Sequence, residues 1–185
     1  MAHTFFYLQM AFRSPPDDEV RQRVREVILH AGERQNAQEK RTQYTHLRRV
    51  LGLAWPRLKR MTWDLVRTDE AKDAYEEWYT DLEDSSDFPD LSPNSAKPRQ
   101  QHMVLTVILL AERDSNSDMH LGQCCDLDAT HWRDAKTAQM LLESLESLSF
   151  ASVHGDAIYL QPAPGQPGPT EAQLVTDWPE LDAVE

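Results

Sequence analysis

The sequence predicts an α+β fold, in which a small β-sheet centred on residues 103–111 carries helices on its faces. The first observation behind this prediction is the run from His102 to Ala111, the longest apolar stretch of the chain, which is rich in β-branched residues. Its apolar residues do not alternate with polar ones, which favours a strand buried on both faces. The second observation is that apolar residues recur at helical spacing over much of the remaining chain, which predicts helices that cover this strand.

Two further segments are predicted to flank the central strand. Residues Phe5 to Phe12 combine aromatic side chains with the alternation typical of a strand. Ala157 to Gln161 forms a second, shorter apolar run near the end of the chain. The expected sheet therefore joins the first, the middle and the last strand-like segments.

The first helix is expected to begin after Ser14, which can cap it. Pro15 and Pro16 suit a first helical turn, and the acidic residues that follow favour the positive end of the helix dipole. Gly32 is expected near the end of this helix. Its predicted buried stripe consists of Val20, Val24, Val27, Ile28 and Ala31.

Residues 36–84 are predicted to form a helical insert or subdomain. Pro56 separates a helix before it from a short helix after it. Thr68 to Glu70 is expected to open a further helix, and residues 85–101, with three prolines, are interpreted as a flexible linker. The three apolar stripes are Tyr44, Leu47, Val50, Leu51 and Ala54; Leu58, Met61, Leu65 and Val66; and Ala71, Ala74, Tyr75, Trp78 and Leu82.

The last third of the chain is expected to alternate turns, strands and helices. A turn is expected at Arg113 to Asp118, followed by a short return strand at Met119 to Cys125. Gly122 weakens the prediction of this strand. A helix then begins at Asp128 or Thr130. A capping box at Thr170 to Gln173 predicts a last short helix that ends near Trp178.

Composition indicates one acidic domain spanning residues 1–185. The chain has 185 residues, a net charge of -12 and 40% hydrophobic residues, which is typical of a globular rather than a disordered protein. It shows no secretory-signal pattern and no apolar run long enough to cross a bilayer. The only cysteines, Cys124 and Cys125, are adjacent, which favours free thiols and a cytoplasmic location.

The charge is unevenly distributed along the sequence. Residues 1–67 hold 13 Lys and Arg against 7 Asp and Glu, and residues 68–185 hold 6 against 24. Three interpretations follow: the two halves attract each other within the fold or an oligomer, the acidic part binds a protein partner, or the basic helices at 34–60 bind nucleic acid. The third is disfavoured, because a chain of this net charge repels phosphate.

No motif for catalysis or for phosphate binding is present, so we expect no cofactor and no catalytic residue. Four residues are weak candidates for metal ligands or for a thiol-dependent enzyme or sensor: His120, Cys124, Cys125 and His131. Their spacing matches no standard ligand motif, and nearby aspartates would oppose a reactive thiolate.

Candidate partner-binding residues come from two helical segments. Tyr75, Trp78 and Tyr79 could form an aromatic ridge beside acidic residues, because interfaces favour Tyr and Trp. The alternative is that Tyr75 and Trp78 belong to the core. Arg48 and Arg49 complete the candidate set, on a helix whose arginines face water or an acidic neighbour.

Several segments carry a resemblance to domain-of-unknown-function family 1517, which is best known from cyanobacteria and plastids. Val104 to Ala111 resembles the family's V-V-T-L-L-V-A strand, and Ala157 to Ala163 is similar to its following strand, with Tyr159 where the family has leucine or tryptophan. Leu145 to Ser149 matches in part, and Thr170 to Leu181 is similar to the family's closing element. The resemblance covers about the last 80 residues and departs from the family pattern in the middle helices.

The resemblance implies a bacterial-type protein but brings no known reaction, cofactor or catalytic residue. The hypothesis that the sequence favours is therefore a non-catalytic cytoplasmic protein that binds another protein or itself. No membrane association is expected, and nucleic acid is an unlikely partner.

Overall fold

The computed structural model of the chain describes residues 2–30, 36–84, 101–162 and 165–184. Gly32 and residues 85–100 of the predicted linker lie outside these described residues. The helices and strands are, in chain order, β1 (His3–Arg13), α1 (Glu19–Leu29), α2 (Ala37–Leu51), η1 (Trp55–Arg57), β2 (Leu58–Val66), α3 (Ala71–Asp84), β3 (His102–Glu112), α4 (Asn116–Cys125), η3 (Ala129–His131), α5 (Ala135–Glu146), η4 (Phe150–Ser152), β4 (Val153–Gln161), α6 (Glu171–Asp177) and β5 (Asp182–Ala183).

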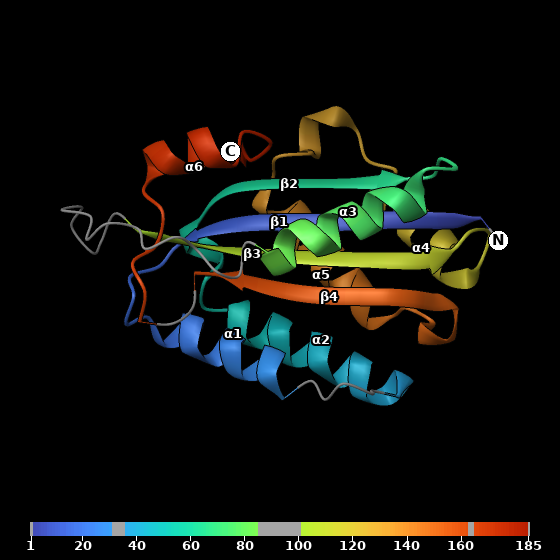
Figure 1. Ribbon diagram of the computed structural model, residues 1–185, viewed down its shortest axis with the longest axis horizontal. Helices are drawn as coiled ribbons and strands as arrows, with labels where there is room; N and C mark the ends of the chain where they lie inside the picture. The colour runs from blue at the N-terminus through green and yellow to red at the C-terminus, as the bar shows by residue number, and fades with distance from the viewer. Residues whose placement is uncertain (1, 31–35, 85–100, 163–164, 185) are drawn as a thin grey trace.

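The described residues form one five-stranded antiparallel sheet in the order β4-β3-β1-β2-β5, which confirms the predicted α+β class. The predicted central strand is confirmed, because β3 pairs with β1 on one side and with β4 on the other (Figure 1). The pairing of β1 with β3 runs without interruption from His3 opposite Glu112 to Arg13 opposite His102. Both predicted flanking strands are therefore neighbours of β3.

Each face of the sheet carries its own apolar layer, because successive residues of a strand point to opposite faces. Phe6, Leu8 and Met10 of β1 belong to the larger layer, which α1, α2, α4 and α5 cover. Phe5 of β1 lies on the other face, where α3 packs against it. At the far end of this second face, Ala11 packs against Leu174 of α6. The sheet thus lies between a four-helix layer and two separate helices, α3 and α6.

The helices of the larger layer interlock the two halves of the chain. A strand, two helices and a strand occur in succession twice, as β1-α1-α2-β2 and as β3-α4-α5-β4. The helices of each unit reach strands of the other, since α1 contacts β4 and α4 contacts β2, while α2 packs against α5. Neither half can therefore bury its own strands alone.

The prediction of a helix at Leu58 to Val66 is wrong: these residues form β2, which pairs with β1. The expected helical insert at 36–84 is therefore helical at α2 and α3 but is divided by a strand of the main sheet. The spacing of Leu58, Met61 and Leu65 fits a helix, yet Met61, Trp63 and Leu65 also alternate as a strand does. The segment forms a strand because its backbone pairs with β1.

Two further predictions in the last third of the chain are wrong. Met119 to Cys125 is not a return strand but part of α4, whose N-cap is Ser115. The next α-helix, α5, begins at Ala135 after the N-cap Asp134, rather than at Asp128 or Thr130. The capping box that Thr170 and Gln173 form at the start of α6 is confirmed.

The N-terminus of α1 is organised around Asp18 rather than Ser14. Asp18 is the N-cap and accepts a bond from the Val20 N–H, while the Ser14 hydroxyl donates to the Asp18 carboxylate at 2.9 Å. Arg57 of η1 forms an ion pair with the same carboxylate at 2.5 Å. Burial disfavours the charged form, but these bonds outweigh it and lower the pKa of Asp18.

Ion pairs between the basic and acidic parts of the sequence support the first interpretation of the charge asymmetry. Lys40 of α2 lies 2.9 Å from Asp156 of β4, and Arg48 pairs with Glu146 of α5. Further pairs join Arg60 to Glu171 and Arg67 to Asp118. In the described part of the chain, no helix is long and apolar enough to cross a membrane.

We predict that Asp18→Ala lowers the free energy of unfolding by roughly 1–3 kcal/mol, because it removes both a helix cap and a charge-assisted hydrogen bond. The folded-state pKa of Asp18 is depressed, so its contribution is present above the unfolded pKa and is lost as the pH falls through the folded value. Urea denaturation at pH 7 and at about pH 3 measures this.

Asp18→Asn is the matched control, since asparagine also caps helices but carries no charge. At pH 7 it should lie between the wild type and Asp18→Ala. A difference between wild type and Asp18→Asn that is unchanged in acid would contradict this assignment.

Candidate functional site

The three aromatic candidates of α3 lie over the face of the sheet that contains Phe5. The Trp78 ring stacks on Tyr7 with 4.5 Å between centroids, and Tyr75 packs edge-on against Phe5. Tyr79 is 36% exposed and approaches Tyr159 of β4. Tyr75 and Trp78, which are half-buried, thus serve mainly to attach α3 to the sheet, and Tyr79 is the most exposed residue of this ridge.

The candidate arginines lie on α2, on the opposite side of the sheet from α3. Arg48 is bound to Glu143 and Glu146 of α5. Arg49 is exposed and lines a hollow of about 460 Å³ between α1 and α2, together with His30 and His46. The structure therefore does not bring the aromatic ridge and the arginines into one site.

The histidine and cysteine candidates do not assemble into a metal centre within the described residues, which hold no group of three potential ligands. His120 and Cys124 are neighbours one turn apart on α4, with 3.9 Å between Nε2 and Sγ. The His120 Nε2 also lies 3.2 Å from the Ser144 carbonyl oxygen. His131 belongs to the separate turn η3.

Cys125 lies at the base of a groove but is poorly suited to thiolate chemistry. Burial and the neighbouring Cys124 raise the pKa of the Cys125 thiol to about 12, and the nearby Arg67 offsets only part of this. A thiol with this pKa is protonated at neutral pH and is a weak nucleophile. The structure gives no support to a catalytic role for this residue.

The groove that contains Cys125 runs along the outer edge of β2. Its volume is about 830 Å³. On its outer side β2 pairs with β5 only at Arg60 and Met61, so the edge from Thr62 to Val66 has no strand partner among the described residues. The lining residues are Tyr7, Thr62, Trp63, Asp64, Leu65, Arg67, Met119, Gly122, Gln123, Cys125, Asp126, Trp132 and Asp182.

Large apolar side chains border this free edge. Met119 of α4 is 51% exposed and Trp132 is 53% exposed. The Trp63 indole N–H donates to the Trp132 carbonyl oxygen at 3.2 Å, and the two rings meet edge to face. An exposed cluster of this kind beside an unpaired strand is typical of a binding surface rather than of a core.

The groove is also acidic. Its lining includes the exposed carboxylates of Asp64, Asp126 and Asp182 and a single guanidinium, that of Arg67. Arg67 is held by Asp118 at 2.9 Å, and Asp182 pairs with Arg133. Asp64 and Asp126 make no ion pair with a described cation. The free edge therefore presents negative charge and apolar surface together.

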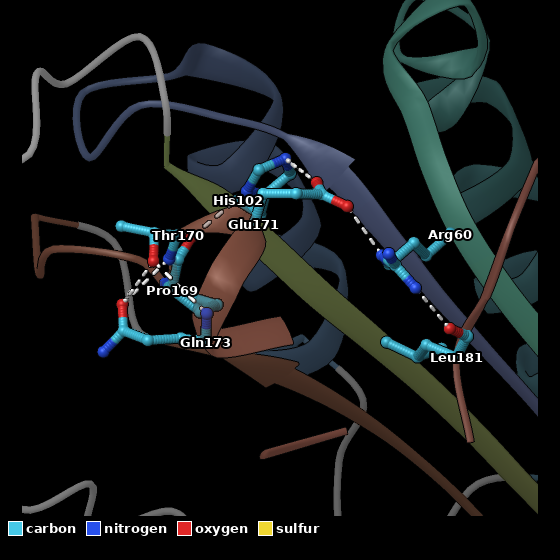
Figure 2. A network of polar contacts seen from close by, with 7 residues as sticks. All are labelled: Arg60, His102, Pro169, Thr170, Glu171, Gln173 and Leu181. Carbon is cyan, nitrogen blue, oxygen red and sulfur yellow. Dashed lines mark hydrogen bonds and ion pairs between the residues drawn. The ribbon is translucent and has the colours of Figure 1, made fainter. Parts of the chain in front are cut away.

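A second hollow, of about 510 Å³, lies where β1 ends and β3 begins. His102 is 3% exposed, and its Nδ1 lies 3.1 Å from the Pro169 carbonyl oxygen (Figure 2). Its Nε2 has no hydrogen-bond partner and lies 3.4 Å from the Glu171 carboxylate. Arg60 holds the other oxygen of that carboxylate at 2.7 Å.

The backbone around this hollow is fixed by a buried arginine. The guanidinium of Arg21, which is 0% exposed, donates to the carbonyl oxygens of Ser14, His102 and Gln166. Burial lowers the pKa of Arg21 to about 10, which leaves it charged at neutral pH. Gly168 completes the packing, because its N–H donates to the Gln101 side chain at 3.0 Å.

Comparisons of the chain with protein-family models, with curated proteins and with solved structures gave no match. The resemblance to domain-of-unknown-function family 1517 therefore stays a prediction. The class of the protein is therefore given by its α+β fold with an antiparallel sheet. The candidate sites are argued from the residues of this chain alone.

Sequence reasoning missed both the groove along β2 and the hollow beside His102. The alternation of Met61, Trp63 and Leu65 was the signal that could have predicted the edge strand β2. Its position beside Trp132 follows only from the fold. For the second hollow, His102 and Glu171 are too far apart in the sequence for any local pattern to join them.

We predict that Cys125 resists thiol reagents in the folded protein. In the Cys124→Ser variant, which leaves Cys125 as the only thiol, reaction with a disulfide reagent at pH 7.5 should be at least about 100-fold slower than in urea. Stopped-flow absorbance measures both rates. Equal rates in the folded and unfolded protein would contradict the raised pKa of this thiol.

We predict that Gly168→Ala destabilises the fold by about 1–3 kcal/mol, because an added Cβ would lie 2.0 Å from the His102 carbonyl oxygen. Gly52→Ala is the milder comparison, since its Cβ would lie 3.1 Å from the Arg49 carbonyl oxygen, a tight contact but much longer than that at Gly168. Urea denaturation compares the two variants. A Gly168→Ala protein as stable as the wild type would show that the contact between the added Cβ and the His102 carbonyl oxygen is relieved without cost.

Proposed function

We propose that this protein is a non-catalytic interaction module that binds an extended segment of a partner protein along the free edge of β2. The observation that carries the proposal is the unpaired strand from Thr62 to Val66 beside a groove of about 830 Å³. An edge strand offers backbone N–H and C=O groups to which an extended peptide can add as a further strand. On this edge the Leu65 N–H donates to the Asp64 carboxylate at 2.7 Å, so an added strand would have to displace that side chain to use this group.

The groove chemistry indicates what such a segment would contain. Alternate side chains of an added strand point to opposite faces, so one set would contact Trp63, Met119 and Trp132. The carboxylates of Asp64 and Asp126 favour Lys or Arg in the segment. The expected partner segment is therefore extended and combines apolar with basic residues.

Self-association through this edge is disfavoured by charge. The free edge is centred on Asp64, so a symmetric antiparallel pair of two copies would place the two Asp64 side chains directly opposite each other. Like charges in directly opposite positions are destabilising. A different, basic partner fits this surface better than a second copy.

The nucleic-acid alternative finds less support, because several cations of the basic helices are already paired. Lys40 binds Asp156, Arg48 binds two glutamates, and Arg57 binds Asp18. The thiol or metal alternative rests on His120 and Cys124 alone, which is too few ligands for a stable site.

The test uses synthetic peptides and amide NMR of the full chain. An eight-residue peptide of alternating valine and lysine should shift the amide signals of Thr62 to Val66 and the Trp132 indole signal. A valine–glutamate peptide of equal length should not. We expect Trp132→Ala to weaken binding at least about tenfold, as truncation of an interfacial tryptophan typically does.

Leu53→Ala is the control, since Leu53 is 74% exposed and does not line the groove. Shifts spread over the whole acidic surface, equal binding of both peptides, or binding unchanged in Trp132→Ala would each refute the proposal. Circular dichroism of Trp132→Ala verifies that the variant is folded.

A further inference from the structure

We propose that the hollow beside His102 binds the phosphate group of a small phosphorylated molecule. This site is separate from the β2 edge and rests on different residues. Its walls are Arg13, Lys59, His102, Thr170, Glu171 and Ala172.

Two cations of this hollow have no carboxylate partner. Arg13 ends β1 and Lys59 lies near the start of β2, and neither forms an ion pair with any described acidic residue. The neighbouring cations Arg57 and Arg60 are each paired with a carboxylate, whereas these two are not. Two cations facing one concave surface are a typical arrangement for binding a doubly charged oxyanion.

The one acidic residue of the hollow does not cancel these charges. Glu171 is already bound by Arg60, which in turn donates to the Leu181 carbonyl oxygen at 2.8 Å (Figure 2). The Arg60–Glu171 pair is therefore neutral as a unit. The positive charges of Arg13 and Lys59 remain available to a ligand.

The second, independent observation is the Nε2 of His102, which completes no hydrogen bond and lies 3.4 Å from the Glu171 carboxylate. The imidazole is almost fully buried, its Nδ1 faces the Pro169 carbonyl, and Nε2 points toward the side of the hollow that holds Glu171. A buried ring nitrogen that completes no hydrogen bond, with only a carboxylate oxygen 3.4 Å away, requires an explanation. Because Nδ1 donates to the Pro169 carbonyl oxygen, Nε2 carries a hydrogen only in the imidazolium form, and in that form it could donate to a phosphate oxygen in the hollow.

The volume of the hollow limits the ligand. About 510 Å³ is within the range of small-molecule sites and exceeds what a bare phosphate needs. The shape therefore suits a phosphate ester with a small organic group, which would extend beside Thr170 and Ala172.

Binding should be linked to protonation of His102. Burial lowers the pKa of His102; the Pro169 carbonyl and Glu171 raise it, and Arg13 and Lys59 lower it further. A bound dianion would favour the imidazolium form, so affinity should increase as the pH falls. The charged groups facing His102 are Arg13 from β1, Arg21 from α1, Lys59 and Arg60 from β2, and Glu171 from α6.

The test is titration of the full chain, at constant ionic strength, with inorganic phosphate and with glycerol 3-phosphate, followed by amide NMR. We expect saturable shifts at Lys59, His102 and Thr170, with the ester binding more tightly. Arg13→Gln and Lys59→Gln should each weaken binding at least about tenfold, the effect of losing one charge-assisted hydrogen bond. Arg49→Gln, which makes the same charge change on α2, should bind as the wild type does.

Sulfate tests the pH linkage, because it stays doubly charged between pH 5 and 8, and its affinity should increase over that range as the pH falls. Binding of inorganic phosphate and the ester with equal affinity would limit the site to the free anion and overturn the small-molecule assignment. Absence of saturable binding up to about 10 mM, or binding unchanged in both glutamine variants, would overturn the site altogether.

Discussion

The pairing of β1 with β3 is the interaction on which the rest of this structure depends. Both strands are eleven residues long and buried on both faces over most of their length, so neither face of the sheet centre can be left to water. Helices must therefore cover both sides. The four-helix layer covers one face, and α3 and α6 cover the two ends of the other.

The two edges of the sheet differ because the helices interlock. At one edge, β4 is contacted by α1 and its Asp156 is bound by Lys40 and Tyr44 of α2. At the other edge, β5 covers only two residues of β2. An uncovered edge can pair with another chain unless it is protected. In the proposed function, the charge beside the apolar groove would select the partner.

Charge distribution links the fold to both proposed sites. The basic first part of the sequence and the acidic remainder meet across the interlocked helices, where their ion pairs connect α2 to α5 and to β4. Both proposed sites use charges that these pairs leave over: the carboxylates of Asp64 and Asp126 at the β2 edge, and Arg13 and Lys59 beside His102. An acidic protein thus retains a locally positive hollow beside His102.

The sequence by itself determined the elements whose signal is local. The continuous apolar run of β3 predicts a strand buried on both faces, the alternation of β1 predicts a strand, and the stripes of α2 and α3 predict helices. The structure contains all four elements. Leu58 to Val66 fitted two periods, and only the hydrogen-bonding partner β1 decided for a strand, because strand pairing is non-local. From the sequence, Tyr75 and Trp78 could lie in a core or an interface. The position of α3 places them against Phe5 and Tyr7 of the sheet. The sites were decided by tertiary structure for the same reason, since only the folded sheet brings His102 to Glu171 and Trp63 to Trp132.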